Sequence, residues 1–429
     1  MKATWPNLRE TLWLTAVAAV FFVGLNWAAS CRCLGTVSDS LADVQDKTLD
    51  LVSRFEYRRF GPALPPGTPP VRLVQMDGPT VQQYSPGSYV FNRGALRELL
   101  DELDRQNPKA IFIDLDLSNP TNEPLGGPQL SVGDQQLLSW LQQPRNYPIL
   151  LPTSRSLPST TVLGQPLDKK WSWLCPVSPQ AIRDQDQKVR RIPLRIDPRD
   201  PYPAAEALQI IAGGGACPQP QEELPGGNVY RSRDAYGGIG TRMVFRELEL
   251  WRGLLPISAN KVLAGQTPGL FENSLVLMGR IDLASLDFHP TPLGTLPGVV
   301  LHTNELMTLL SYGRNLRVLS PLVGVPLAFG LALLVLLITP LLSRLILQGL
   351  ERWLAGLRPT QKVGGTRLNF LERPLMWFSL FTASALMLHQ WGLFLDFVFP
   401  ILSLELARIA RERKAASLLT RLFRWAMRS

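Results

Sequence analysis

The sequence predicts an α/β extracytoplasmic domain, with a mostly parallel sheet covered by helices, joined to an α-helical membrane region of about four spans. Three observations favour this arrangement. The first two are that apolar residues gather in uncharged blocks near both ends of the chain, and that short apolar strands alternate with helices between them. The third is charge. The 429-residue chain has a formal net charge of +9, yet residues 30–320 hold 29 basic and 29 acidic side chains. The basic excess therefore lies in the membrane region.

The apolar blocks predict four membrane spans. A membrane core of roughly 30 Å needs about 20 apolar helical residues, and the uncharged residues 11–29 and 321–343 both meet that length. The third apolar stretch, residues 375–407, is too long for a single crossing. A His-Gln-Trp-Gly break at 389–392 divides it, so we expect a helical hairpin with spans at 375–389 and 392–409.

The positions of lysine and arginine predict the orientation, because positively charged flanks stay cytoplasmic. Residues 1–10, the basic loop 344–374 and the basic tail 410–429 are therefore expected in the cytoplasm, and residues 30–320 outside it. The expected location is the inner or plasma membrane, as a multi-pass protein. The neutral domain lacks the basic face that nucleic acid requires, so the expected partners are the lipid bilayer and an unknown extracytoplasmic ligand, with no nucleic acid.

A helix is expected directly after the first span. Apolar or small side chains recur at spacings of three and four, at Val37, Leu41, Val44, Thr48, Leu51 and Phe55. One interpretation is that this helix continues the first span and pairs with a second copy of the chain, forming a homodimer. The other is that it lies on its own domain.

Beyond a proline-rich connector, strands and helices alternate, which predicts a parallel sheet covered on both faces. Strands are expected at residues 71–77, 110–116, 148–152, 189–196 and 274–279. Helices are expected at residues 92–106, 133–142, 204–212 and 301–310.

Polar residues at the strand ends are the first candidate site. Asp114 and Asp116 point to the same face of their strand, and Asp77 ends a comparable strand. Open α/β sheets bind ligands beyond the carboxyl ends of their strands, so these three carboxylates are expected to converge there. They are candidate ligands for a hard cation, and the sequence predicts no particular metal. The alternative is that they cap helices or pair with Arg93.

Histidines form the second candidate site. Asp282, Asp287 and His289 follow the 274–279 strand, and His302 opens the next helix. Imidazole titrates near neutral pH, so either histidine is a candidate pH sensor. The alternative is a structural hydrogen-bonding role.

Cysteine use and the catalytic motifs narrow the function classes. The cysteines Cys31, Cys33, Cys175 and Cys217 all fall on the predicted extracytoplasmic side, where disulfides persist. Cys175 and Cys217 are the candidate pair, linking two loops. The sequence contains no Cys-x-x-Cys zinc pattern, phosphate-binding Gly-x-x-x-x-Gly-Lys-Ser/Thr loop, His-Glu-x-x-His or Gly-x-Ser-x-Gly. We therefore expect neither enzyme activity nor a cofactor.

Several motifs resemble the second class of CHASE domains, the cyclase/histidine-kinase-associated sensory extracellular domains. The most specific is Asp-Phe-His-Pro-Thr-Pro-Leu-Gly at 287–294, followed by Pro-Gly-Val at 297–299 and His-Thr-Asn at 302–304. Further matches are Val-Gln-Met-Asp at 74–77, Arg93 before a helix, the run ending in Asp114, and Leu-Asp-Phe-Val-Phe-Pro at 395–400. The resemblance covers about residues 36–410. The candidate ligand-binding residues are Asp77, Arg93, Asp114, Asp116, Asp282, Asp287, His289, Thr291, His302 and Asn304.

The resemblance implies a sensor that detects an extracytoplasmic stimulus and passes it through the spans. Family members usually end in a histidine kinase, a nucleotide cyclase or a Ser/Thr kinase, whereas only about 20 residues follow the last predicted span here. We therefore expect a stand-alone sensor that relays its signal to a separate output protein. One alternative is a non-sensing assembly or interaction protein of a cell-envelope complex. Another is an exported hydrolase that uses Asp77, Asp114 and Asp116.

Overall fold

The computed structural model describes most of the predicted extracytoplasmic domain and short parts of the membrane region. The described residues are 36–121, 130–153, 161–167, 170–184, 186–194, 201–218, 232–233, 239–313, 377–382, 384–386 and 402–403. The chain divides into two compact units, one formed by Glu56–Leu316 and the other by Met1–Phe55 together with Arg317–Ser429.

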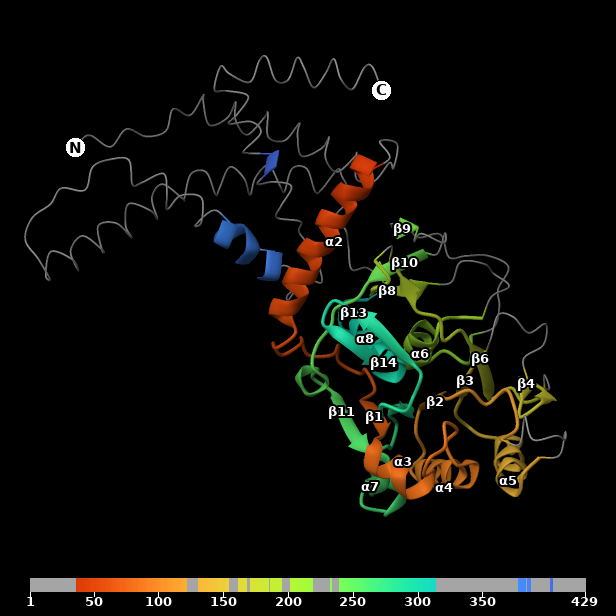
Figure 1. Ribbon diagram of the computed structural model, residues 1–429. Coiled ribbons are helices and arrows are strands. Elements are labelled where there is room, and N and C mark those ends of the chain that lie inside the picture. The colour runs from red at the N-terminus through yellow and green to blue at the C-terminus, as the bar shows by residue number, and fades with distance from the viewer. Residues whose placement is uncertain are drawn as a thin grey trace, which may run out of the picture. The chain divides into compact units, whose positions relative to one another are not determined.

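A six-stranded parallel sheet lies at the centre of the Glu56–Leu316 unit, with the strand order β11-β1-β12-β2-β3-β6 (Figure 1). The predicted parallel sheet is confirmed. The strands are β1 (Val71–Met76), β2 (Ala110–Asp114), β3 (Ile149–Pro152), β6 (Leu174–Val177), β11 (Leu254–Ser258) and β12 (Leu275–Arg280). The late strand β12 lies between β1 and β2, so these two early strands are not neighbours.

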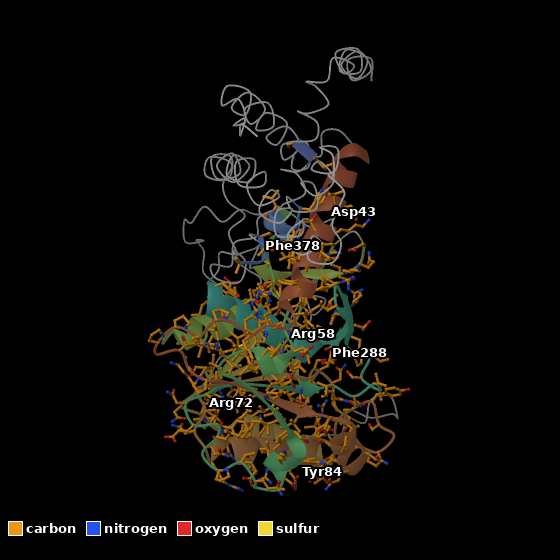
Figure 2. All side chains as sticks on the ribbon, turned by 90° about the vertical axis from the view of Figure 1, so that its left-hand side faces the viewer. Asp43, Arg58, Arg72, Tyr84, Phe288 and Phe378 are labelled. Atoms are coloured by element: carbon orange, nitrogen blue, oxygen red, sulfur yellow. A yellow bond between two sulfur atoms is a disulfide. The ribbon has the colours of Figure 1, made fainter. Side chains whose placement is uncertain are left out.

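Helices cover both faces of this sheet, because strand side chains alternate between two buried sides. Ile111 and Ile113 of β2 belong to a core with the helices α3 (Gly78–Tyr84), α4 (Arg93–Asp104), α5 (Val132–Leu141) and α7 (Ala259–Leu263). On the opposite face, Phe112 packs edge-on against His302 of α8 (Gly298–Tyr312), which lies beside α6 (Ala204–Ala212). Figure 2 shows side chains filling the layers between sheet and helices.

Capping residues fix where the helices of the first core begin. Asn92 accepts a hydrogen bond from the Ala95 amide at 3.1 Å at the start of α4. Ser131 and Asp134 form a reciprocal capping box at the start of α5. The predicted helices at 92–106 and 133–142 therefore agree with the structure to within about two residues.

Smaller elements surround the sheet. Four short strands form a second, antiparallel sheet in the order β7-β8-β10-β9, and two hairpins pair β13 with β14 and β4 with β5. Their bounds, with one 3-10 turn, are β4 (Thr161–Val162), β5 (Gln165–Pro166), β7 (Ile182–Arg183), β8 (Val189–Leu194), β9 (Ser232–Arg233), β10 (Ile239–Arg242), η1 (Leu248–Leu250), β13 (Phe288–Thr291) and β14 (Gly294–Pro297).

The other unit contains most of α2 (Thr36–Glu56), which confirms the helix expected after the first span. Residues 377–382 and 384–386 are also helical. Within this unit the ring of Phe55 meets that of Phe381 edge-to-face, with centroids 5.1 Å apart. Pairing of α2 with a second copy of the chain stays a prediction.

Among the described residues, no helix has both the length and the apolar character needed to cross a membrane. The predicted spans at 11–29 and 321–343 lie outside the described residues, as do the basic loop and the basic tail. The hairpin predicted at 375–409 is described only at residues 377–382, 384–386 and 402–403.

Candidate ligand-binding site

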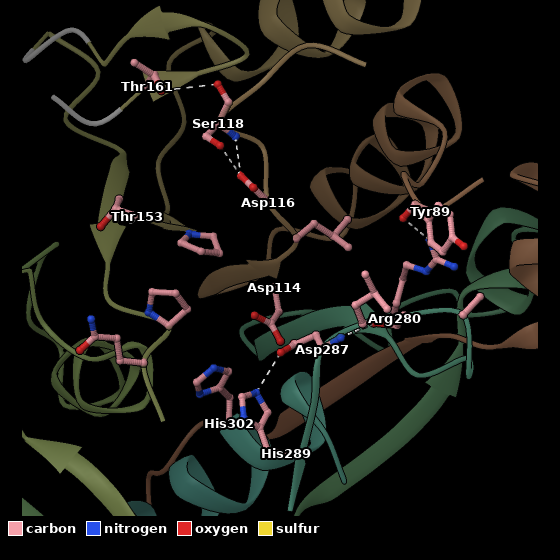
Figure 3. Close-up of a pocket in the computed structure, with 17 residues that line it drawn as sticks. Tyr89, Asp114, Asp116, Ser118, Thr153, Thr161, Arg280, Asp287, His289 and His302 are labelled. Carbon is pink, nitrogen blue, oxygen red and sulfur yellow. Dashed lines mark hydrogen bonds and ion pairs between the residues drawn. The ribbon is translucent and has the colours of Figure 1, made fainter. Parts of the chain in front are cut away.

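A cavity of about 680 Å³ opens at the carboxyl ends of the central strands (Figure 3). Asp114 and Asp116 reach it from the end of β2, Thr153 from the end of β3, and Arg280 from the last position of β12. His302 of α8 forms part of its wall. This is the edge at which open α/β sheets bind ligands, so the cavity is the candidate ligand-binding site.

Asp114 is the partly buried carboxylate of the site. It lies beside Gly279 of β12, where a methyl group would come within 3.2 Å of the Asp114 Cβ and 2.7 Å of the Val299 Cβ. Glycine at 279 thus lets the first turn of α8 approach the sheet next to Asp114. Burial raises the pKa of Asp114 to about 6, against a lowering by the nearby His302. The group is therefore charged at neutral pH and becomes protonated in mildly acidic solution.

His302 is buried and is held by Glu305, one turn along α8, whose Oε2 lies 2.8 Å from His302 Nδ1. Burial lowers the pKa of His302, but the charge and hydrogen bond of Glu305 outweigh this and raise the pKa to about 9. The ring is consequently an imidazolium at neutral pH. Asp114 and Asp287 also favour its protonated form.

Asp287 and His289 form a second pair at the cavity wall, where Figure 3 shows them beside Asp114 and His302. The His289 Nε2 lies 2.9 Å from Asp287 Oδ1. Burial raises the pKa of Asp287, but the hydrogen bond and charge of His289, with the charge of His302, leave this pKa below its ordinary value. Gly298 makes the arrangement possible, because a methyl group there would lie 1.9 Å from Asp287 Oδ2.

Arg280 is a cavity residue that the sequence did not indicate. Its Nε and Nη2 donate to the two oxygens of Asp282, each at 2.8 Å. Its Nη1 donates to the main-chain oxygens of Ser88, at 3.2 Å, and of Tyr89. The guanidinium thereby connects the loop before α4 with the loop after β12. An arginine at the end of an apolar strand and two residues before an aspartate is the only sequence signal for this role.

Four of the expected candidates have structural roles away from the cavity. Asp77 caps α3 by accepting from the Thr80 amide at 3.0 Å, and β12 separates its strand from Asp114. The expected convergence of Asp77 with Asp114 and Asp116 is therefore wrong. Asp116 does line the cavity, and its carboxylate accepts from the Ser118 amide at 2.9 Å. Within the described parts of the chain, no three acidic, histidine or cysteine side chains are grouped to hold a metal ion.

The other three structural residues are Arg93, Thr291 and Asn304. Arg93 is buried, with its Nε 3.8 Å from an oxygen of Asp134, and its Nη2 donates to the Asp116 main-chain oxygen at 3.0 Å rather than to the Asp116 carboxylate. Thr291 closes the β13–β14 turn by donating to the Gly294 main-chain oxygen at 2.6 Å. Asn304 accepts hydrogen bonds from the Arg246 main-chain amide and the Trp251 indole.

A buried junction, formed by Glu56, Arg246 and Tyr312, connects the end of α2 with the end of α8. Arg246 Nη2 lies 3.4 Å from Glu56 Oε2 and donates to the Tyr312 hydroxyl at 3.1 Å. The main-chain amide of Arg246 donates to Asn304 Oδ1 at 2.9 Å, and the Trp251 indole donates to the same oxygen at 3.0 Å. No local sequence pattern indicated this junction, because its members are far apart in the chain.

Cys175 and Cys217 form a disulfide with a sulfur–sulfur distance of 2.06 Å. Cys175 lies within β6 rather than in a loop, so the bond ties an outer strand of the main sheet to the segment after α6. Cys31 and Cys33 lie outside the described residues.

Comparison with known proteins gives one family and no individual relative. No curated protein and no solved structure matches the chain significantly. The sequence profile of the CHASE2 domain matches residues 14–341, which is most of the chain. This range includes the whole sheet, the cavity and the 287–304 run that suggested the resemblance. The chain therefore belongs to the CHASE2 family, and its Glu56–Leu316 unit is a sensory domain of the kind implied to act outside the cytoplasm.

Proposed function

We propose that this protein is a transmembrane sensor that binds a small extracytoplasmic molecule in the cavity and relays the event to a separate output protein. The observation that supports this proposal best is the position of His302. It lines the cavity and belongs to α8, the helix that ends at Tyr312, shortly before the span predicted at 321–343. A ligand that contacts the cavity wall thus has direct access to the helix leading to the membrane.

The junction supports a route for the signal. A shift of α8 at the cavity would act on Tyr312 at its other end, and Arg246 connects Tyr312 with Glu56 at the end of α2. These two helices adjoin the second and the first predicted spans. A ligand moves such an equilibrium only by binding one arrangement more tightly than the other. We propose that ligand binding repositions the two spans through this junction.

A retention experiment tests the ligand-binding step. The full chain in lipid nanodiscs is incubated with a small-molecule extract of the growth medium of cells that produce the protein. The retained compounds are then identified by mass spectrometry. Thr153→Trp fills the cavity, whereas Thr295→Trp on the exposed strand β14 is the matched control. The wild type and the control should retain a compound that Thr153→Trp loses. Equal retention by all three proteins would argue against the cavity.

The membrane topology is part of the proposal and is supported by the basic flanks of the apolar blocks. Reporter fusions after residues 60, 200, 360 and 429 test it. We expect extracytoplasmic activity at the first two positions and cytoplasmic activity at the last two. Extracytoplasmic signal at residue 360 or 429 would contradict the four-span arrangement.

A second candidate function is docking in a cell-envelope complex without sensing. One observation favours it: Leu283 and Leu286, on the loop after β12, are 92% and 89% exposed. Cross-linking and co-purification of the full chain separate the two functions. A fixed stoichiometric partner that Leu286→Ser releases, with no retained small molecule, would favour docking.

Catalysis is not proposed, and replacing Asp77, Asp114 and Asp116 by Asn should leave any co-purifying hydrolytic activity unchanged.

A further inference from the structure

We propose that the cavity takes a small organic molecule with a protonated amine and an apolar portion. This inference rests on the proposed function and specifies the ligand class of the same site. Four observations support it. The cationic side chains of the cavity are already paired, and its carboxylates have oxygens without partners among the described residues. The Asp287 carboxylate lies at the amino-terminal end of α8, and apolar side chains line the cavity mouth.

The cationic groups of the cavity wall are already paired. Arg280 makes two 2.8 Å hydrogen bonds with the Asp282 carboxylate, and the buried His302 is 2.8 Å from Glu305. Each of these pairs is close to electrically neutral. An anionic ligand would have to compete with a carboxylate that is held in place, which makes these groups poor anion receptors.

The carboxylates, in contrast, are available. The Asp114 carboxylate makes no hydrogen bond with any other described residue, although it lines the cavity and is partly buried. Asp116 uses one oxygen, Oδ1, for Ser118, and Asp287 uses Oδ1 for His289. The lining thus keeps a net negative charge after the internal pairs are counted. A protonated amine supplies the donors and the charge that these oxygens lack.

The amino-terminal end of α8 is not available as an anion site. The Asp287 main-chain oxygen accepts from the Gly298 amide at 3.0 Å, and Asp287 Oδ2 lies 1.9 Å from the position that a Cβ at residue 298 would take. Helix amino termini attract anions, but here the Asp287 carboxylate lies against the first residue of α8, and its negative charge opposes a second anion. A phosphate or carboxylate ligand at this end of α8 would lie beside the like charge of Asp287.

The mouth of the cavity favours an apolar portion on the same ligand. Tyr89 and Leu286, which are 74% and 89% exposed, lie on its lining, and both loops that bear them are bonded through Arg280. Figure 3 shows Tyr89 beside Arg280 at some distance from Asp114. An ammonium at Asp114 with an apolar group toward Tyr89 and Leu286 would cover both surfaces.

The titration of Asp114 adds a signature for this ligand. Its pKa, raised to about 6 by burial, leaves the carboxylate ionised at neutral pH. As the pH falls below about 6 the carboxylate takes up a proton, and its attraction for an ammonium disappears. The charged and titratable groups that face Asp114 are His302 and Glu305 of α8, and Asp287 and His289 at β13. His302 is already protonated, with a pKa of about 9, and Asp287 has a lowered pKa.

Three isosteric probes test the proposal on the full chain in nanodiscs by isothermal calorimetry: phenethylamine, phenylethanol and phenylacetate. The amine should bind about tenfold or more tightly than the other two, the usual effect of one charge-assisted hydrogen bond. Asp114→Asn should remove that advantage. Glu272→Gln, an exposed carboxylate at the opposite end of β12, should keep it. In the wild type, affinity for the amine should weaken below a pH of about 6.

The outcomes separate this inference from the proposed function. Equal or tighter binding of phenylacetate, or amine binding that survives Asp114→Asn, overturns the amine assignment but leaves a ligand-binding cavity. Failure of all three probes to bind overturns the amine assignment as well. If Thr153→Trp also retains the same compounds as the wild type in the extract experiment, the sensor proposal fails with it. If the Asn variant does not fold, the wild-type pH profile decides, because affinity that is unchanged below a pH of about 6 excludes a role for the Asp114 charge.

Discussion

Replacement of Arg246 by methionine tests whether the junction is held by a buried charge pair. Arg246 and Glu56 are almost completely buried, and the guanidinium donates to main-chain oxygens of Glu56 at 3.0 Å and Arg59 at 2.7 Å as well as to Tyr312. Methionine fills a similar volume and removes all of these donors. The Glu56 carboxylate then remains buried, with Arg59 at 3.8 Å as a more distant counter-charge.

The expected cost follows from this geometry. Removing one partner of a buried ion pair costs about 3–5 kcal/mol, because the other charge is left uncompensated. We take the lower end, about 3 kcal/mol, since Arg59 offers part of the compensation. For a unit of this size 1 kcal/mol shifts the Tm by about 2–4 °C, so Arg246→Met should lower it by about 6–12 °C. Thermal unfolding of the full chain in nanodiscs, followed by tryptophan fluorescence, measures the shift.

Two further variants make the measurement decisive. Arg58→Met removes an exposed arginine, 3.7 Å from Glu247, and should change the free energy of unfolding by less than about 1 kcal/mol. Combining Arg246→Met with Glu56→Met removes the buried carboxylate as well and should recover at least half of the lost stability. A loss of less than about 1 kcal/mol in Arg246→Met, or no recovery in the double variant, would refute the charge-pair argument.

Three other changes give measurable outcomes in the same unfolding assay. Asp114→Asn should raise stability at neutral pH by up to about 3 kcal/mol, because the folded pKa of about 6 lies above the ordinary value; this gain should vanish below about pH 4, where the carboxyl is protonated in both states. Gly298→Ala should destabilise by about 1–3 kcal/mol, since the new methyl group meets the Asp287 carboxylate at 1.9 Å; an unchanged Tm would contradict that close approach. Replacing Cys175 and Cys217 by serine should cost about 2–4 kcal/mol, and a reductant should then lower the Tm of the wild type but not of the variant.

The strands and helices of the main sheet were largely predictable. β2, β3 and β12 are mainly apolar runs, the pattern of strands that are buried on both faces of a parallel sheet, and β1 is apolar except for Arg72 and Gln75. α6 occupies the predicted residues 204–212. β11 was missed because its five residues include Pro256, which interrupts a strand pattern and is tolerated at an edge position of the sheet.

The order of the strands was not predictable from local patterns. β12 pairs with both β1 and β2, and this insertion places Asp77 on the far side of a strand from Asp114. Arg280 was missed for a related reason. Its partners Ser88 and Tyr89 are about 190 residues earlier in the chain, and periodicity describes only neighbours in sequence.

The insertion of β12 also affects how the domain acquires its structure. Residues 275–280 are made after the five other strands of the sheet, yet among the described residues they supply the one strand that pairs with both β1 and β2. A nascent chain that has reached β11 therefore holds two separate half-sheets with exposed edges. Such non-local pairing is slow and leaves apolar edges open to aggregation. Completion of the sheet should therefore wait for β12, so that the cavity and the following helix α8 form together, late in the synthesis of this unit.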